Sequence, residues 1–345
     1  MQIRPAPRFV VLAGVMLLAL SACTGEPSAP DVARHATDVP PETPHSKPAF
    51  LNDVNAFSFV VVGDRTGGHR PGVFAAAMQQ LSLLQPTFVL SVGDLIEGYT
   101  ASESTIEAQW DELDAIVQTL PMPFFYTAGN HDLSNPLMTD IWARRLGKTY
   151  WHFVHDDVLF ISLNTEDPPT ALPEASMAGH ARLEAGMAKD PVGTQTKLLA
   201  YVRDRDAPKK PGEVAISDTQ VAYVASVLNQ YPNVRWTFLL MHKPAWLYDN
   251  PAFLEVESLL ADRPYSVIAG HEHYYSHEKR HDRDYIDMGT TGGVWLQDGP
   301  GRTDHILLVT MAAGGPVYAN IKLNGLSDQR GVPDPIFDLY GDIGK

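Results

Sequence analysis

Five short polar segments carry the residue types that bind metal ions and move protons, and each directly follows a run of apolar residues. They are Gly63-Asp64-Arg65-Thr66-Gly67-Gly68, Gly93-Asp94, Gly129-Asn130-His131-Asp132, Met241-His242-Lys243-Pro244 and Gly270-His271-Glu272-His273. A single aspartate of this kind is usually a turn or helix cap, and a single histidine is usually structural. Five such segments in chain order favour one shared site.

The apolar runs before these segments are predicted β-strands. Ligands of an open α/β sheet gather at the carboxyl ends of its strands, so the segments can converge although about 210 residues separate the first from the last. Carboxylate oxygens and neutral imidazoles suit manganese, zinc or iron. Two such cations lower the pKa of a bridging water enough to supply hydroxide near neutral pH. The sequence therefore predicts a hydrolytic metal centre at the strand ends.

The order and residue types of the segments resemble the calcineurin-like metallophosphoesterase superfamily, and the resemblance covers residues 56–325. Gly-Asn-His-Asp and Gly-His-Glu-His are its most specific parts. It implies two divalent metals about 3 to 4 Å apart, a spacing that suits a shared ligand and in-line attack at phosphorus. The ligands it implies are Asp64 and His273 for the first metal, Asp94 as the bridge, and Asn130, His242 and His271 for the second.

The resemblance also implies roles for the two residues after Asn130. His131 is expected to act on the substrate, where it stabilises developing charge or protonates the leaving oxygen. Asp132 is expected to orient the His131 ring, as carboxylates beside a metal site commonly do.

The first segment departs from the family pattern, which usually reads Asp-x-His and takes a first-metal ligand from that histidine. This chain has Thr66 at the position. Purple acid phosphatases also lack the histidine and use a tyrosine three residues after the bridging aspartate, where this chain has Glu97. The Glu97 carboxylate either replaces that ligand or merely caps its own loop.

Cationic residues around the Gly67-Gly68 turn are candidates for substrate binding. Arg65, His69 and Arg70 flank this turn, and guanidinium groups pair bidentately with phosphate oxygens. Arg65 is the strongest candidate of the three. The alternative is that all of them belong to a solvated loop.

Three functions are consistent with these residues. The leading one is a phosphoesterase that hydrolyses phosphomonoesters or phosphodiesters by metal-bound hydroxide, with His131 as general acid. A second enzyme hypothesis is a nucleotidase or cyclic-nucleotide phosphodiesterase. The non-enzymatic alternative is a surface lipoprotein whose eroded metal site binds phosphorylated ligands, and the Thr66 substitution supports it.

The elements that must position the site alternate between β-rich runs and helical patterns, which is typical of a layered α/β domain. Predicted strands include residues 57–62, 87–92, 123–127, 235–241 and 265–269, and predicted helices include 72–84, 102–119, 218–230 and 252–261. A hairpin is expected from 150–154 and 158–163. The family resemblance implies a four-layer α/β/β/α sandwich of two mixed sheets flanked by helices.

The chain outside the sheets divides by composition. We expect a metallophosphoesterase domain over residues 53–325, with a C-terminal tail over 326–345. Within the domain, residues 165–215 are rich in Pro, Ala, Gly and charge and have weak periodicity. We interpret them as an insertion near the site that sets the size of the leaving group.

The first 23 residues have the pattern of an export signal. Arg4 and Arg8 precede an apolar run of about 12 residues, which is too short for a transmembrane helix of about 20 residues. Leu20-Ser21-Ala22-Cys23 resembles the lipobox of bacterial lipoproteins, which implies acylation at Cys23. The alternative is an ordinary secretory signal with an incidental cysteine. The expected location is the bacterial cell envelope, with a lipid anchor in the membrane.

Residues 24–52 are Pro-rich, without hydrophobic periodicity, and predict a flexible tether. Cys23 is the one cysteine of the chain, so the domain has no intramolecular disulfide and must rely on its core and metals. The formal charge of −15 opposes nonspecific binding to nucleic acid. The expected partners are a phosphate-ester substrate and the membrane.

Overall fold

The computed structural model describes residues 44, 46–47, 55–169, 173–203, 209, 211–331 and 335–337. The chain divides into a unit of residues Met1–Asn52 and a unit of residues Asp53–Lys345. Only the second unit contains helices and strands among its described residues. The predicted signal, Cys23 and nearly all of the predicted tether lie outside the described residues.

One sheet of the second unit has five strands in the order β11-β10-β1-β2-β3. Strand β2 is parallel to β1 and β3, whereas β10 is antiparallel to β1 and β11. Val60 of β1 lies opposite Val89 of β2 on one side and Leu308 of β10 on the other. The bounds are β1 Phe57–Val62, β2 Phe88–Ser91, β3 Phe124–Phe125, β10 His305–Ala312 and β11 Gly315–Lys322.

The other sheet has six strands in the order β4-β5-β6-β7-β9-β8. Its central strands β5, β6, β7 and β9 are parallel, and the edge strands β4 and β8 are antiparallel to their neighbours. The bounds are β4 Trp151–His155, β5 Val158–Ser162, β6 Trp236–Leu240, β7 Tyr265–Ala269, β8 Ser276–Arg280 and β9 Arg283–Asp287. The predicted hairpin and the predicted strand 265–269 are present.

Alternating side chains of the strands build the layers, because successive residues of a strand point to opposite faces. In β1, Phe59 and Val61 belong to a buried core shared with the second sheet, whereas Val60 and Val62 belong to a core shared with helices. Phe59 packs edge-on against Phe160 and Phe238 at ring distances of 5.2 and 5.0 Å. The sheets therefore pack face to face.

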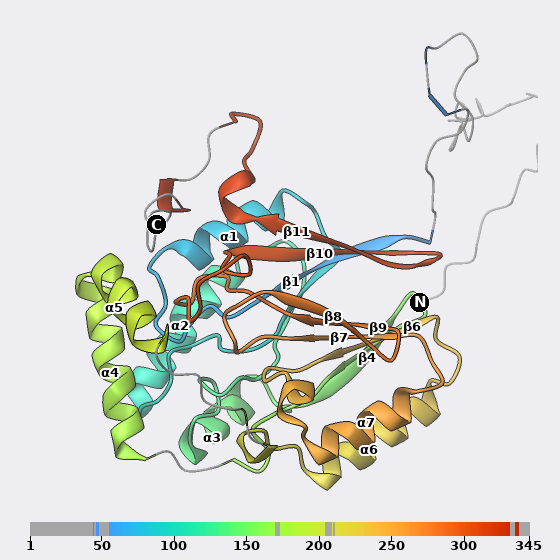
Figure 1. Cartoon of the computed structure of the whole chain (residues 1–345), viewed down its shortest axis with the longest axis horizontal. Coiled ribbons are helices and arrows are strands. Elements are labelled where there is room, and N and C mark those ends of the chain that lie inside the picture. Colours follow the sequence, from blue (N-terminus) through green and yellow to red (C-terminus); the bar gives the residue numbers. More distant parts are fainter. Residues whose placement is uncertain are drawn as a thin grey trace, which may run out of the picture. The chain divides into compact units, whose positions relative to one another are not determined.

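Helices cover the outer face of each sheet and complete the predicted four-layer α/β/β/α sandwich (Figure 1). The first sheet packs against α1 Val73–Ser82, α2 Glu103–Val117 and α3 Pro136–Arg145. The second sheet packs against α6 Asp218–Gln230 and α7 Pro251–Leu260. Side chains of Ser102, Asn135, Ser217 and Asn250 cap four of these helices by accepting a backbone N–H.

Three helices lie where the sequence analysis predicted none. Helix α3 begins at Asn135-Pro136, a cap followed by proline at the first helical position. The segment 165–215 contains α4 Glu174–Lys189 and α5 Pro191–Arg203, which lie side by side at one end of the unit (Figure 1). Its described residues are thus largely helical.

Short 3-10 turns complete the unit: η1 Pro211–Glu213, η2 Ala245–Tyr248, η3 Leu323–Gly325 and η4 Pro335–Phe337. Phe337 lies buried in the core of α1 and α2, so part of the expected C-terminal tail contributes to the fold. Within the described part of the chain, no helix is long and apolar enough to cross a membrane.

Candidate metal centre

The polar segments come together because the strands before them end at the same edge of the two packed sheets. Asp64 follows β1, Asp94 follows β2, His242 follows β6 and His271 follows β7. The backbone bends sharply here: φ is +55° at Asp94, +78° at His271 and +52° at His273. Left-handed backbone at non-glycine residues is uncommon and clusters at functional sites. The structure thus brings residues that are far apart in sequence close together at this edge.

Glycine allows the side chains to approach the backbone closely. A Cβ atom at Gly129 would lie 2.2 Å from Oδ1 of Asp94, and one at Gly270 would lie 2.5 Å from Oδ2 of Asp64. Both distances are below any real Cβ contact. Each carboxylate therefore occupies space that only glycine leaves open.

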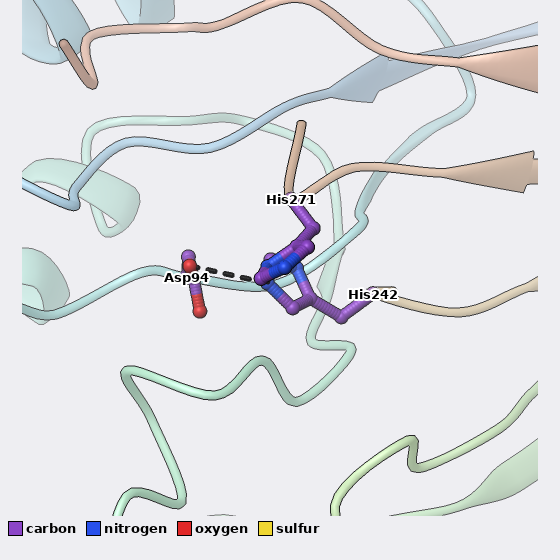
Figure 2. A group of neighbouring side chains, drawn as sticks. All are labelled: Asp94, His242 and His271. Carbon is purple, nitrogen blue, oxygen red and sulfur yellow. Dashed lines mark hydrogen bonds and ion pairs between the residues drawn. The ribbon is translucent and has the colours of Figure 1, made fainter. Parts of the chain in front are cut away.

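The first set of ligand atoms is called the His242 group and consists of Asp94, His242 and His271, whose ligand atoms all lie within 4.8 Å of one another. Nε2 of His242 is 3.1 Å from Oδ2 of Asp94 and 3.3 Å from Nδ1 of His271. Figure 2 shows the Asp94 carboxylate facing the two imidazoles. Oδ1 of Asn130 is 3.0 Å from Nε2 of His242, so the amide oxygen faces the same group.

The second set is called the His273 group and consists of Asp64, Asp94 and His273, with the same 4.8 Å limit. Nε2 of His273 is 3.4 Å from Oδ1 of Asp64. The two groups share Asp94. This arrangement places the carboxylate of one residue between two sets of donors.

The outer ring nitrogens of the histidines are held by backbone carbonyls. Nδ1 of His242 donates to the Val92 carbonyl at 2.8 Å, and Nδ1 of His273 donates to the Val294 carbonyl. A carbonyl only accepts hydrogen bonds, so each Nδ1 carries a proton, and in the neutral ring each Nε2 presents its lone pair inward. Second hydrogen bonds of this kind orient histidine ligands in metal sites.

The donors fit a cation. Oδ2 of Asp64 is buried without a hydrogen-bond partner among the described residues. Burial lowers the pKa of His242, but the Asp94 carboxylate outweighs this and the pKa rises to about 9. Burial and the neighbouring His242 hold the pKa of His271 well below its ordinary value. The carboxylate thus favours a positive charge at His242, and a cation bound there would take the place of that proton.

His131 lies against the shared carboxylate. Its backbone N–H donates to Oδ1 of Asp94 at 2.8 Å, and its Nε2 is 3.9 Å from Oδ2 of the same residue. Nδ1 of His131 donates to the Glu97 carbonyl at 2.7 Å. The ring is buried, with only 5% of the residue exposed. Its Nε2 is therefore the nitrogen that faces the metal groups.

Asp132 does not have the expected geometry, because its carboxylate binds backbone N–H groups instead of the His131 ring. Oδ2 accepts from the N–H groups of Asp94 and Gly129, each at 2.9 Å. Oδ1 accepts from Leu95 at 2.9 Å and Ile96 at 3.1 Å. Asp132 thus holds the loop that carries Asp94, and the Glu97 carbonyl orients His131.

Glu97 lies outside both ligand groups, contrary to the suggestion that it fills the position left by Thr66. Its carboxylate accepts from the N–H groups of Gly68 and His69 at 3.1 and 2.5 Å and lies 3.0 Å from Nδ1 of His69. Burial raises the pKa of Glu97, but the hydrogen bond to His69 and the other polar contacts lower it overall. Glu97 ties the 63–70 loop to its own loop, and the His273 group keeps three ligands.

Arg65 and Arg70 point away from the ligand groups. The Arg65 guanidinium donates to the Leu95 carbonyl at 2.8 Å and to Glu112 of α2. The Arg70 guanidinium donates to the Gly293 carbonyl and to Asp304. Both are buried and connect loops, and the guanidinium of Arg65, which was expected to contact phosphate, is bound to Leu95 and Glu112.

Two residues of the site were not identified from the sequence. The Tyr99 hydroxyl accepts from Nδ2 of Asn130 at 3.0 Å, which turns the amide oxygen toward His242. His180 of α4 packs on the Tyr99 ring at 3.7 Å. Both line a cavity of about 380 Å³ between α4 and residues 97–101. Neither belongs to a motif, so only the folded chain reveals them.

Comparison with known proteins gives a consistent result. A family model described as calcineurin-like phosphoesterase matches residues 49–275. No curated protein matches the sequence. Residues 49–275 account for more than half of the chain.

Two solved structures share the fold at low sequence identity, and a third has a lower similarity. A dimetal phosphatase from Danio rerio is similar with a TM-score of 0.52 and 13% identity, covering 79% of this chain and 97% of that one. The structure of PhoD is similar with a TM-score of 0.51 and 10% identity, covering 80% and 70%. A purple acid phosphatase from yellow lupin has a TM-score of 0.48 and 13% identity, covering 77% and 51%.

Proposed function

Since this chain belongs to the calcineurin-like phosphoesterase family and is therefore a metal-dependent hydrolase of phosphoric esters, we propose that it cleaves phosphomonoesters or phosphodiesters at a two-metal centre with His131 as general acid. The observation that carries the proposal is the sharing of Asp94 by two ligand groups, with Nε2 of His131 facing the same carboxylate. The fit of the donors supports two divalent ions chosen from manganese, zinc and iron.

The protein's own residues have separable tasks. Asp64 and His273 would hold one ion, Asn130, His242 and His271 the other, and Asp94 would contact both. Bound divalent ions activate a water nucleophile and neutralise charge on the phosphoryl group. Because Nδ1 of His131 is committed to the Glu97 carbonyl, the proton that reaches the leaving oxygen must sit on Nε2. A leaving alkoxide depends most on this proton.

The test measures hydrolysis of nitrophenyl phosphate and bis-nitrophenyl phosphate by the purified chain before and after chelation and reloading with each metal. Activity is expected to vanish on chelation and return with metal. His131→Ala is expected to lower kcat for an alkyl phosphate by about a hundredfold or more, and kcat for the nitrophenyl esters, whose leaving group needs little protonation, by much less, with intact metal content. His277→Ala, on the exposed strand β8, is the matched control and is expected to match the wild type.

One outcome would contradict the proposal, and another would narrow it. A chain that binds two metals but hydrolyses no mono- or diester on a broad panel would favour the alternative of a lipoprotein that binds phosphorylated ligands. Hydrolysis restricted to nucleotides or cyclic nucleotides would instead narrow the proposal to a nucleotidase or phosphodiesterase. The ratio of monoester to diester rates decides the substrate class.

The proposed setting of this hydrolase is the bacterial cell envelope. The pattern of residues 1–23 supports export and acylation at Cys23. The Pro-rich segment that follows would separate the domain from the membrane.

A further inference from the structure

The proposed proton donor, His131, is surrounded by other residues of the site. The His131 ring is held by one hydrogen bond, from Nδ1 to the Glu97 carbonyl. The Tyr99 ring lies 4.5 Å from it at an interplanar angle of 54°, and the His180 ring lies 5.0 Å from it at 89°. Asp94 lies near its Nε2. One hydrogen bond restricts the side-chain torsions of His131 only in part, so the packed rings also determine where Nε2 points.

The edge-on contact to His131 comes from α4, outside the five sequence segments. His180 also packs on Tyr99 with ring centroids 3.7 Å apart and planes inclined by 35°. Tyr99 in turn accepts from Nδ2 of Asn130. One imidazole of the 165–215 segment therefore contacts two rings of the site.

The helical pair that carries His180 is attached firmly to the rest of the fold. Gln195 of α5 donates to the Trp295 carbonyl and accepts from the Trp295 N–H, both at 2.9 Å and both buried. Leu183 of α4 lies so close to Gly68 that a Cβ atom there would be 3.0 Å from it. These contacts place α4 over the 63–70 loop.

His180 acts through the faces and edge of its ring. Its Nδ1 is buried without a hydrogen-bond partner among the described residues. Burial and the neighbouring His131 lower the pKa of His180 to about 4, so the ring is neutral near pH 7. A neutral aromatic ring suits both the stacked contact with Tyr99 and the edge contact with His131.

We propose that His180 is a positioning residue that holds the His131 ring, directly and through Tyr99, in the orientation for protonating the leaving group. This inference rests on the proposed function, in which His131 donates the proton to the leaving oxygen. Small misplacements of a reacting group cost rate. The cost must appear mainly with esters whose leaving group needs a proton.

The test compares His180→Ala with the wild type on an alkyl phosphate and on nitrophenyl phosphate, whose leaving group needs little protonation. The kcat for the alkyl ester is expected to fall about tenfold, and that for the nitrophenyl ester less than about twofold. His180→Phe keeps a flat ring and is expected to restore most of the alkyl rate. His180→Leu, which fills the space without a flat ring, is expected to give an intermediate ratio and covers the case in which the alanine variant does not fold.

Arg182→Ala changes an exposed residue of the same helix and is the matched control. Equal losses on both esters, or a phenylalanine variant as impaired as the alanine variant, would overturn the positioning role while leaving the proposed hydrolysis intact. A wild type that hydrolyses neither ester would instead overturn the proposed function and this inference with it.

Discussion

The two ligand groups that share Asp94 differ in how completely they surround a cation. The His242 group has two imidazoles and a carboxylate, and the Asn130 amide oxygen, which is oriented by Tyr99, faces it as a further donor. The His273 group has two carboxylates and one imidazole. Glu97, the residue nearest in chemistry to a fourth ligand, binds the backbone of Gly68 and His69 instead. The His242 group therefore offers a cation more donors, whereas the His273 group would hold its cation mainly through the negative charges of Asp64 and Asp94.

The largest expected effect is that of Asp94→Asn, which removes the charge that both groups share. Asparagine tolerates the left-handed backbone at this position, where φ is +55°. We expect kcat/KM to fall by roughly a thousandfold, since loss of shared metal ligation costs several kcal/mol of transition-state stabilisation. The number of metal ions per chain, measured by mass spectrometry, is expected to fall below one, because both groups lose the Asp94 carboxylate.

Asp156→Asn is the control for this substitution, because Asp156 lies on the β4–β5 turn with φ +45° and has no place in the site. It is expected to leave activity and metal content unchanged. Complete retention of one metal in Asp94→Asn would show that the groups do not share this carboxylate.

A smaller effect separates the groups from each other. During dialysis against increasing chelator concentration, the His273 group is expected to lose its metal first. The chelator concentration needed is expected to be roughly tenfold or more below that for the His242 group. His273→Ala is expected to abolish this early step and keep the late one, and His242→Ala is expected to do the reverse. A single release step in the wild type, or identical curves for the two variants, would remove the distinction between the groups.

The smallest effect tests the assignment of Glu97 to the loop. Glu97→Gln is expected to keep its metal content and to lose about 1 to 2 kcal/mol of unfolding free energy at pH 7, because the N–H groups of Gly68 and His69 lose a charged acceptor. The folded-state pKa of Glu97 lies below its ordinary value. Its stabilisation is therefore present above pH about 4.3 and is lost as the pH falls further, so wild type and variant must converge in acid.

Denaturant unfolding at several pH values measures this difference, and Glu255→Gln on the exposed side of α7 is the control. If Glu97→Gln loses one metal, and if its unfolding free energy does not converge with that of the wild type at low pH, then Glu97 is a metal ligand.

The strands and the candidate ligand residues were predictable because their signals are local. Apolar runs mark β1, β2, β6 and β7, and Asp64, Asp94, Asn130, His242, His271 and His273 each stand in a short segment of recognisable type. Helix α6 was also predicted with its observed bounds, because both of its signals are local. These are the cap at Ser217 and the helical spacing of the apolar residues that follow it.

The second layer of contacts was not predictable, because a charged side chain near a strand end has several possible partners with the same chemistry. A carboxylate binds a metal ion or several N–H groups equally well by type, and Asp132 and Glu97 do the latter. A guanidinium binds phosphate or carboxylate, and Arg65 binds Glu112, which is 47 residues away. Directions of side chains are set by packing, which the order of residues does not state.

The sequence by itself determined the alternating strands and helices and the residues able to bind metal, because periodicity and ligand type are properties of short segments. The family and its four layers followed from the resemblance that those segments carry. Only the tertiary structure decided that Asp94 is common to two groups, that Glu97 and Asp132 hold loops, and that α4 brings His180 to His131. Each of these depends on contacts between segments tens of residues apart, and such contacts exist only after the sheets and helices have packed.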